Sequence, residues 1–483
     1  MLDGATALHL ANRLGFGPAP GELARIRKLG FEAYIDEQLS PDLKNLPAPI
    51  NAALHKIPSF GKNTYELYKE FWWKVQLPAS MAGKPPKDIK RLVKRVSNQI
   101  PDQARSARLV RAIASPWRLQ EALVEFWFNH FNVYEKKETS RIWVGAYEDE
   151  AIRPHTLGRF RDLLLATAKH PVMLIYLDNA RNVAPVTLSS GARQRGKATG
   201  INENYAREVM ELHTLGVDGG YTQSDVTALA HILTGWTVGF DPRETANGAP
   251  VKGGFWFAAP RHDPSAQTLL GRHFAGGLEE GEEALLMLAK HPSTAHHVSF
   301  KLAQYFVADQ PPPTLVSAMT DTFRKTDGDL RAVTRLMLVS KEFRDPEKFG
   351  RKFKTPYAYV VSAARATNYD LQRVDPLIVA LKQLGQPLYG CVTPDGYACT
   401  ETAWLDPDAM MRRISFAIAF GNGRFGVAHP GNDSLAPSGP VDADRLIETI
   451  GPALSVNARS ALAKTAKSLW AGAVLGSPDF MRC

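Results

Sequence analysis

The chain has 483 residues, of which 44% are hydrophobic and 22% are charged. These values are ordinary for a folded protein, so they exclude a largely disordered chain, and the length allows a large core without disulfides or metals as cross-links. No stretch approaches the roughly 18 unbroken apolar residues of a membrane-spanning helix. The net charge of +9 favours anionic partners, although it is modest for this length.

The first residues contain no recognisable export signal. The run MLDGATALHLANRLGFGP lacks a basic segment followed by an apolar one. On this ground we expect a cytoplasmic protein.

Most of the chain has the apolar spacing of helices. Residues 116–131 have apolar side chains at helical spacing, with Ser115 as a candidate cap and Pro116 as the first helical residue. Thr222 and Asp225 have the spacing of a capping box, and an apolar stripe follows them. Segments in which apolar and polar residues alternate, as in β-strands, are scarce. Residues 248–275 are the best candidate for a small irregular or β excursion. We therefore predict a mainly α protein with a large, bundle-like helical body.

Glycine and proline content suggests how this body is divided. We predict a main helical domain over 1–419, which includes a basic helical insertion at about 78–112. Residues 420–441 are rich in glycine and proline and predict a linker loop. Residues 442–483 then form a C-terminal helical segment that packs on the body.

The basic run KDIKRLVKR spans residues 87–95 of that insertion. Its lysines and arginines at helical spacing fit nucleic acid or an anionic membrane surface, but a solvated helix face is favoured. The rest of the chain lacks matching basic or aromatic elements for reading bases. We therefore expect no nucleic-acid partner.

The densest group of polar residues lies in GINENYAREVMELHTLGVDGGYTQSDV, residues 200–226. We expect a helix from about 203 to 215, on which Asn204, Glu208, Glu211 and Leu215 fall on one line. Two carboxylates one turn apart can divide acid and base roles, because mutual repulsion raises one pKa. They can also bind a hard cation.

The alternative for this helix is a solvated face with ion pairs. Arg207 lies four residues from both Glu203 and Glu211, which is the spacing of helical ion pairs. Asn202 and Asn204 replace the lysines of a typical surface helix, and this composition is better suited to a hydrogen-bonded polar network.

Two further side chains are candidates for the same chemistry. His130 shares an apolar stripe with Trp127, so it is either a buried core histidine or a general acid or base whose pKa is set by burial. Asp178 follows the helical run MLIYL, where such residues usually form turns.

Several other residues are candidates for positioning a substrate. Arg193 and Arg195 lie in a glycine- and serine-rich loop before the acidic helix, and they either clamp an anionic group or form an exposed tip. His262 and Asp263 are neighbours, an arrangement that can orient an imidazole but is common by chance. Trp236 and Trp404 could stack on sugar faces.

Many familiar motifs are missing from this sequence. It contains no GxSxG, GxxxxGK[ST] or HExxH pattern, so we predict no nucleotide, no common serine hydrolase chemistry and no transition metal or other cofactor. Cys391 and Cys399 flank VTPDGYA, and they form either a local disulfide in an exported protein or two free thiols, which we prefer.

The chain resembles the bacterial proteins grouped as domain-of-unknown-function family 1800. The matching runs, in chain order, are HLANRLGFGPAPGEL (9–23), EFWFNHFNV (125–133), IRPHTLGRFRDLL (152–164), MLIYLDN (173–179), INENYAREVMELHTLGVDGGYTQSDV (201–226), LTGWTV (233–238), RHD (261–263), LGQPLYGCVTPDGY (384–397) and AWLDP (403–407). The resemblance implies a helical protein that is often exported and often found beside a partner family resembling sulfatases. A periplasmic or secreted location therefore stays open, and the resemblance implies no activity and no catalytic residues.

The sequence leads to one functional hypothesis and two alternatives. We expect a hydrolase that acts on a polar or anionic glycan-like polymer, with Glu208 and Glu211 as the carboxylate pair, or Glu203 with Glu208. The supporting candidates are Asp178 and His130 for catalysis, and Asn202, Asn204, Arg207, Arg193, Arg195, Trp236, His262, Asp263 and Trp404 for substrate binding. The first alternative is a non-catalytic binding or assembly protein whose Asn, Glu and Arg network is structural. The second is an enzyme that depends on a hard metal.

Overall fold

The structure is a computed structural model, and it describes residues 2–43, 45–72, 87–185, 200–239, 254–425 and 439–483. Of residues 71, 72 and 87–97 it describes the backbone alone. The predicted loop arginines Arg193 and Arg195 and most of the 420–441 linker lie outside the described residues, as do the side chains of the basic run 87–95.

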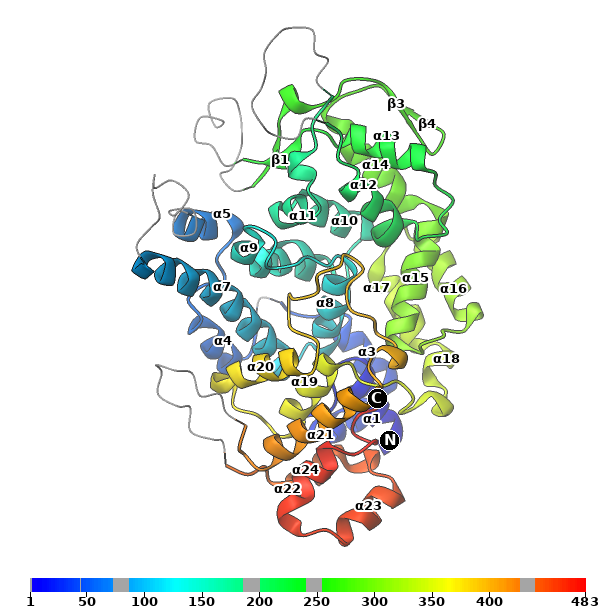
Figure 1. Ribbon diagram of the computed structural model, residues 1–483. Helices are drawn as coiled ribbons and strands as arrows, with labels where there is room; N and C mark the ends of the chain where they lie inside the picture. The colour runs from blue at the N-terminus through cyan, green and yellow to red at the C-terminus, as the bar shows by residue number, and fades with distance from the viewer. Residues whose placement is uncertain (1, 44, 73–86, 186–199, 240–253, 426–438) are drawn as a thin grey trace.

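The described chain is built mainly from helices, as the sequence predicts (Figure 1). The first half contains α1 (Gly4–Arg13), α2 (Glu22–Leu29), α3 (Phe31–Gln38), α4 (Ala48–His55), α5 (Thr64–Leu67), the π-helical η1 (Tyr68–Trp72), α7 (Lys87–Ala114), α8 (Arg118–His130), α9 (Ser140–Tyr147), the π-helical η2 (Glu148–Ile152), α10 (Phe160–Lys169), α11 (Pro171–Tyr176), α12 (Asn204–Glu208), the π-helical η5 (Val209–Thr214) and α13 (Gln223–Ile232). The second half contains α14 (Leu278–Lys290), α15 (Pro292–Phe306), α16 (Pro313–Lys325), α17 (Leu330–Val339), α18 (Lys341–Arg344), α19 (Pro356–Ala366), α20 (Asp375–Gln383), α21 (Pro407–Gly421), α22 (Ala443–Ile450), α23 (Val456–Ala463) and α24 (Trp470–Leu475).

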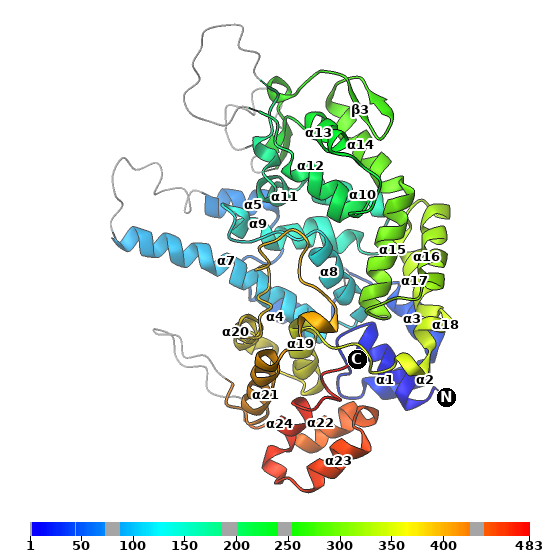
Figure 2. The ribbon, with the colours of Figure 1, turned by 45° about the vertical axis from the view of Figure 1, so that its right-hand side comes forward.

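Helix α8 lies at the centre of the body and is buried on every side (Figures 1 and 2). It begins at Arg118, two residues later than predicted, and Ser115 accepts a hydrogen bond from the backbone N–H of Trp117 at 3.1 Å. A helix that is buried all round must satisfy its own polar side chains. In α8 these include Gln120, Glu121 and Glu125.

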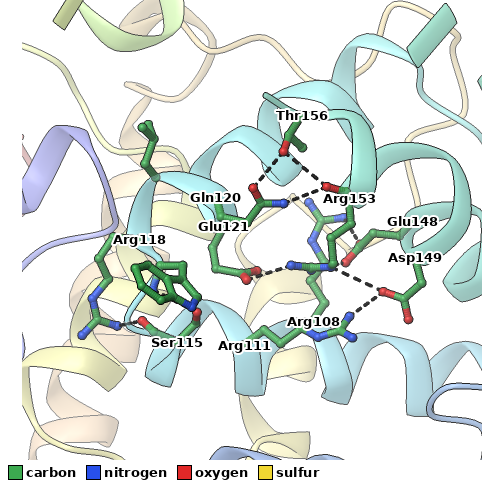
Figure 3. A network of polar contacts seen from close by, with 12 residues as sticks. Arg108, Arg111, Ser115, Arg118, Gln120, Glu121, Glu148, Asp149, Arg153 and Thr156 are labelled. Atoms are coloured by element: carbon green, nitrogen blue, oxygen red, sulfur yellow. Dashed lines mark hydrogen bonds and ion pairs between the residues drawn. The ribbon is translucent and has the colours of Figure 1, made fainter. Parts of the chain in front are cut away.

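Arginines from neighbouring elements satisfy these groups in one buried network (Figure 3). Arg153 pairs with Glu121 at 2.7 Å and with Glu148 at 2.8 Å. Arg108 pairs with Glu148 at 3.1 Å and also with Glu125. Because removing one partner from such a pair leaves a buried charge uncompensated, this network fixes how α7, α8 and η2 pack.

The β excursion consists of two small antiparallel pairs. Strand β1 (Trp236–Val238) pairs with β2 (Phe255–Phe257), and β3 (Gln267–Leu269) pairs with β4 (Arg272–Phe274). Three of these four strands fall within the predicted 248–275 region, while β1 precedes it.

The C-terminal segment contains α22, α23 and α24. Helices α24 and α21 pack closely at two glycines, since a Cβ on Gly421 would lie 2.6 Å from the backbone nitrogen of Gly472. The chain then returns to the body, where Arg482 forms an isolated antiparallel bridge with Phe353. Both termini therefore lie at the same end of the molecule (Figure 1).

No helix in the part of the chain that the structure describes is both long enough and apolar enough to cross a membrane.

Candidate functional site

A long connection between α20 and α21 crosses in front of α8 (Figures 1 and 2). Two asparagines at the end of α8 hold this connection in place. The Asn129 side chain donates to the carbonyl of Tyr397 and accepts from its N–H, both at 2.7 Å. Asn132 donates to the carbonyls of Thr393 at 2.8 Å and Cys391 at 3.2 Å. The run FNHFN therefore fastens the segment 391–400, here called the site loop, to the central helix.

A cavity of about 200 Å³ lies between the site loop, α8, η5 and α15. Its polar lining comes from Asn129 and His130 on α8, from His297, Lys301, Gln304 and Tyr305 on α15, and from Asp395, Tyr397, Cys399 and Thr400 on the site loop. Most of these groups can donate or accept hydrogen bonds, so the cavity is suited to a small polar ligand.

Two histidines of this cavity are held by backbone carbonyls of η5. The Nε2 atom of His130 lies 3.0 Å from the carbonyl oxygen of His213, and that of His297 lies 3.2 Å from the carbonyl oxygen of Leu212. These carbonyls belong to the last turn of a helix, where they lack helical partners. In the neutral imidazole, Nε2 must therefore carry the hydrogen and Nδ1 is an acceptor.

Burial keeps both imidazoles neutral. It lowers the pKa of His130 well below the ordinary value, and the charges of His297 and His213 lower it further. Burial likewise lowers the pKa of His297 to about 4. The cavity thus presents neutral imidazoles near pH 7.

Glu208 and Glu211 precede Leu212, which lines the cavity, but neither glutamate belongs to the cavity lining itself. Glu208 is half-buried, and burial raises its pKa, as do the negative charges of Glu211 and Asp395. Among the described residues, none forms a hydrogen bond or ion pair with its carboxylate. Glu211 accepts a hydrogen bond from the hydroxyl of Tyr221 at 3.1 Å. The two carboxyl groups are therefore close neighbours in different environments.

The rest of the NENYARE run faces another element. Glu203 accepts hydrogen bonds from Thr227 at 2.7 Å and Gln223 at 2.8 Å, both on α13, and it pairs with Arg207 at 3.1 Å. This group fastens α12 to α13.

Asn202 and Asn204 form a separate turn at the start of α12. The Asn202 N–H donates to Asn182 at 2.9 Å, and the Asn202 side chain accepts from the N–H of Asn204 at 3.0 Å. The structure therefore divides the predicted constellation into an anchor, formed by residues 202–204 and Arg207, and a carboxyl pair.

Four other predicted residues lie away from the cavity lining. Asp178 adopts a left-handed turn conformation with φ of 60° and pairs with Lys137 at 3.0 Å. Asp263 lies 2.5 Å from His231, and His262 lies against the carbonyl of Thr234 at 3.0 Å. Trp236 is fully buried and offers no face to a sugar.

Trp404 lies beside the site loop. Its ring nitrogen donates to the carbonyl of Ala398 at 2.7 Å, and its ring centre is 6.2 Å from that of Tyr397. It therefore supports the loop that lines the cavity.

The sequence analysis missed Asp395, His297 and Lys301. Asp395 lies in the quoted run LGQPLYGCVTPDGY, whose PDG turn signals a loop but not its place beside α8. His297 and Lys301 are four residues apart on α15, a spacing that places them on one helix face but does not reveal what that face meets.

The described residues contain neither a metal-binding group nor a disulfide. Within the described ranges, no group of three or more His, Cys, Asp or Glu side chains could hold a metal ion. Cys391, Cys399 and Cys483 are all free thiols, which agrees with the preferred expectation for the first two.

These features define a mainly helical protein with a polar cavity at the end of its central helix. The family model described as "Protein of unknown function (DUF1800)" matches residues 9–482, and the chain belongs to this family. A search of curated proteins found no match, and a search of solved structures found none either.

Proposed function

We propose that the protein is a hydrolase that acts on a polar or anionic glycan-like polymer, with Glu208 and Glu211 as its carboxyl pair. The observation that supports this most is the raised pKa of Glu208, a half-buried carboxyl group beside a second one. A carboxyl group that keeps its proton at higher pH can act as a general acid.

The chemistry is that of acid–base hydrolysis. Glu208 donates its proton to the oxygen that leaves, while a second carboxylate takes a proton from the attacking water. The water oxygen bonds to the carbon from which the leaving oxygen departs. Glu211, held by Tyr221, is the first candidate for the second carboxylate, and Asp395 is the other.

The surroundings favour a polymer with hydroxyl groups. His130 offers an acceptor, and Tyr397 together with Trp404 provides aromatic surface at the same loop. Aromatic rings beside hydrogen-bonding groups suit sugars, which have both apolar faces and hydroxyl edges.

The test is release of reducing ends from a panel of neutral polysaccharides, polyuronates and peptidoglycan. We expect wild-type protein to cleave at least one member, and Glu208→Gln and Glu211→Gln each to lower kcat at least ~100-fold, in line with the contribution of general acid–base groups. Glu203→Gln, a matched change on the same helical segment, should retain activity within a few-fold. No release from any member, or equal activity in all three variants, would contradict the proposal.

The contacts of Glu203 favour a second candidate, a non-catalytic binding or assembly protein. Its bonds to α13 show that part of the polar run is an anchor. If Glu208 and Glu211 were anchors as well, both Gln variants would lower the unfolding midpoint at least as much as Glu203→Gln. Catalytic carboxyl groups would instead leave the midpoint unchanged or raise it.

A further inference from the structure

Lys301 is the one lysine among the described residues that line the cavity. It is half-buried, and its positive charge helps to lower the pKa values of His130 and His297. Burial raises the pKa of Cys399, and the charge of Lys301 opposes this rise, so Lys301 lies close to all three side chains. No described carboxylate lies within ion-pair distance of its ammonium group. The only acidic side chain in the described lining, Asp395, is exposed at the rim.

A nearby anion stabilises an ammonium group that is partly removed from water. Among the described residues no carboxylate pairs with Lys301, so the cavity can take an anion from a ligand. A carboxylate is a strong partner, because hydrogen bonds between two charged groups are about twice as strong as neutral ones.

The cavity histidines favour a different part of the same ligand. Their ring centres lie 6.0 Å apart, and each Nε2 hydrogen is used by a backbone carbonyl. The Nδ1 atom of His297 lies against Gly216, where a Cβ would be 2.9 Å from it. The Nδ1 atom of His130 is left as an acceptor for the ligand, and a hydroxyl group is the matching donor. An anion alone would not use this acceptor.

We propose that the cavity binds one hydroxylated carboxylic acid unit, such as a uronic acid residue. Lys301 binds its carboxylate, and His130 accepts a hydrogen bond from one of its hydroxyls. A cavity of about 200 Å³ equals the volume of roughly seven liquid waters, which is the scale of one sugar ring. This assignment rests on the proposed function, because it names one unit of the polymer that the carboxyl pair would cleave.

Binding of single sugars to the full-length protein tests the assignment by calorimetry. We expect glucuronate or galacturonate to bind at least ~10-fold more tightly than glucose or galactose, the scale of one charge-assisted contact. Lys301→Met should remove this preference and leave binding of the neutral sugars unchanged. Lys325→Met, a change on the adjacent helix α16 and outside the cavity lining, is the matched control and should bind like wild type.

His130→Phe provides an independent arm, since it removes the Nδ1 acceptor without changing the charge of Lys301. It should weaken both acidic and neutral sugars. Thermal melting verifies that each variant is folded.

The assignment is overturned if wild type shows no preference for the acids, if it binds none of the four sugars, or if Lys301→Met keeps the preference. Uronate binding that depends on Lys301, without hydrolysis of any polymer, would leave this assignment standing and remove the proposed function. Polymer hydrolysis without a preference for the acidic sugars would leave the proposed function standing and remove this assignment.

Discussion

The attachment of the site loop to α8 can be tested at a single glycine. Gly396 has φ of +73°, a left-handed conformation, and a Cβ at this position would lie 2.4 Å from the backbone oxygen of Asn129. Gly396→Ala therefore combines two penalties. The left-handed conformation costs about 1–2 kcal/mol for a residue with a side chain. The clash also separates Tyr397 from Asn129, whose two hydrogen bonds contribute about 1 kcal/mol each.

The expected loss in the free energy of unfolding is about 3–4 kcal/mol. Gly350→Ala is the matched control, because Gly350 has a similar φ of +65° and a Cβ there would have no other atom within 4 Å. It should lose only the conformational part, about 1–2 kcal/mol. Urea denaturation measures both variants, read from the midpoint at constant slope. Equal losses in the two variants would refute the account of the loop attachment.

Two further predictions concern buried charges. Glu148→Gln should lower the free energy of unfolding, measured by urea denaturation, by about 3–5 kcal/mol, because Arg108 and Arg153 lose a shared buried partner. A loss no larger than that of the exposed control Glu32→Gln would contradict this expectation. Burial lowers the pKa of Lys354 from 10.5 to about 8, so the unfolded chain binds more protons than the folded one between those two pH values. The free energy of unfolding of the wild type should therefore rise by roughly 3 kcal/mol relative to that of Lys354→Met as the pH increases across that window. A difference in free energy between the two proteins that does not change with pH would contradict this expectation.

Local features of the fold could be predicted because they depend on neighbouring residues. The capping box at Thr222 and Asp225 is confirmed, and it begins α13 as expected. The mainly α class is confirmed as well, since apolar spacing reports which helix face is buried.

The sequence predicts one regular α-helix over about 203–215. This prediction is wrong for the second half of the segment. Its second half is the π-helical η5, in which the N–H of Leu215 donates to the carbonyl of Met210 at 2.8 Å. A π turn holds more residues than an α turn, so the predicted line through Glu208, Glu211 and Leu215 does not continue. Leu215 is buried, whereas both glutamates are partly exposed.

The cavity could not be predicted because it depends on contacts between distant segments. His130 is a candidate from the sequence alone, but its neighbours come from α15 and the site loop, which lie far away in the chain. The roles of Asn129 and Asn132 are equally hidden, since their partners lie 268 and 261 residues away. Spacing within one helix contains no information about such contacts.

The raised pKa of Glu208 is the property on which the proposed acid–base pair depends. It can be measured by carboxyl carbon NMR of protein labelled at glutamate, with the resonance assigned by its absence in Glu208→Gln. We predict that Glu208 titrates above the ordinary value of 4.5, and that Glu211→Gln moves this titration to lower pH by removing a neighbouring negative charge. A Glu208 carboxyl that titrates at or below 4.5, or one that does not respond to Glu211→Gln, would contradict the account.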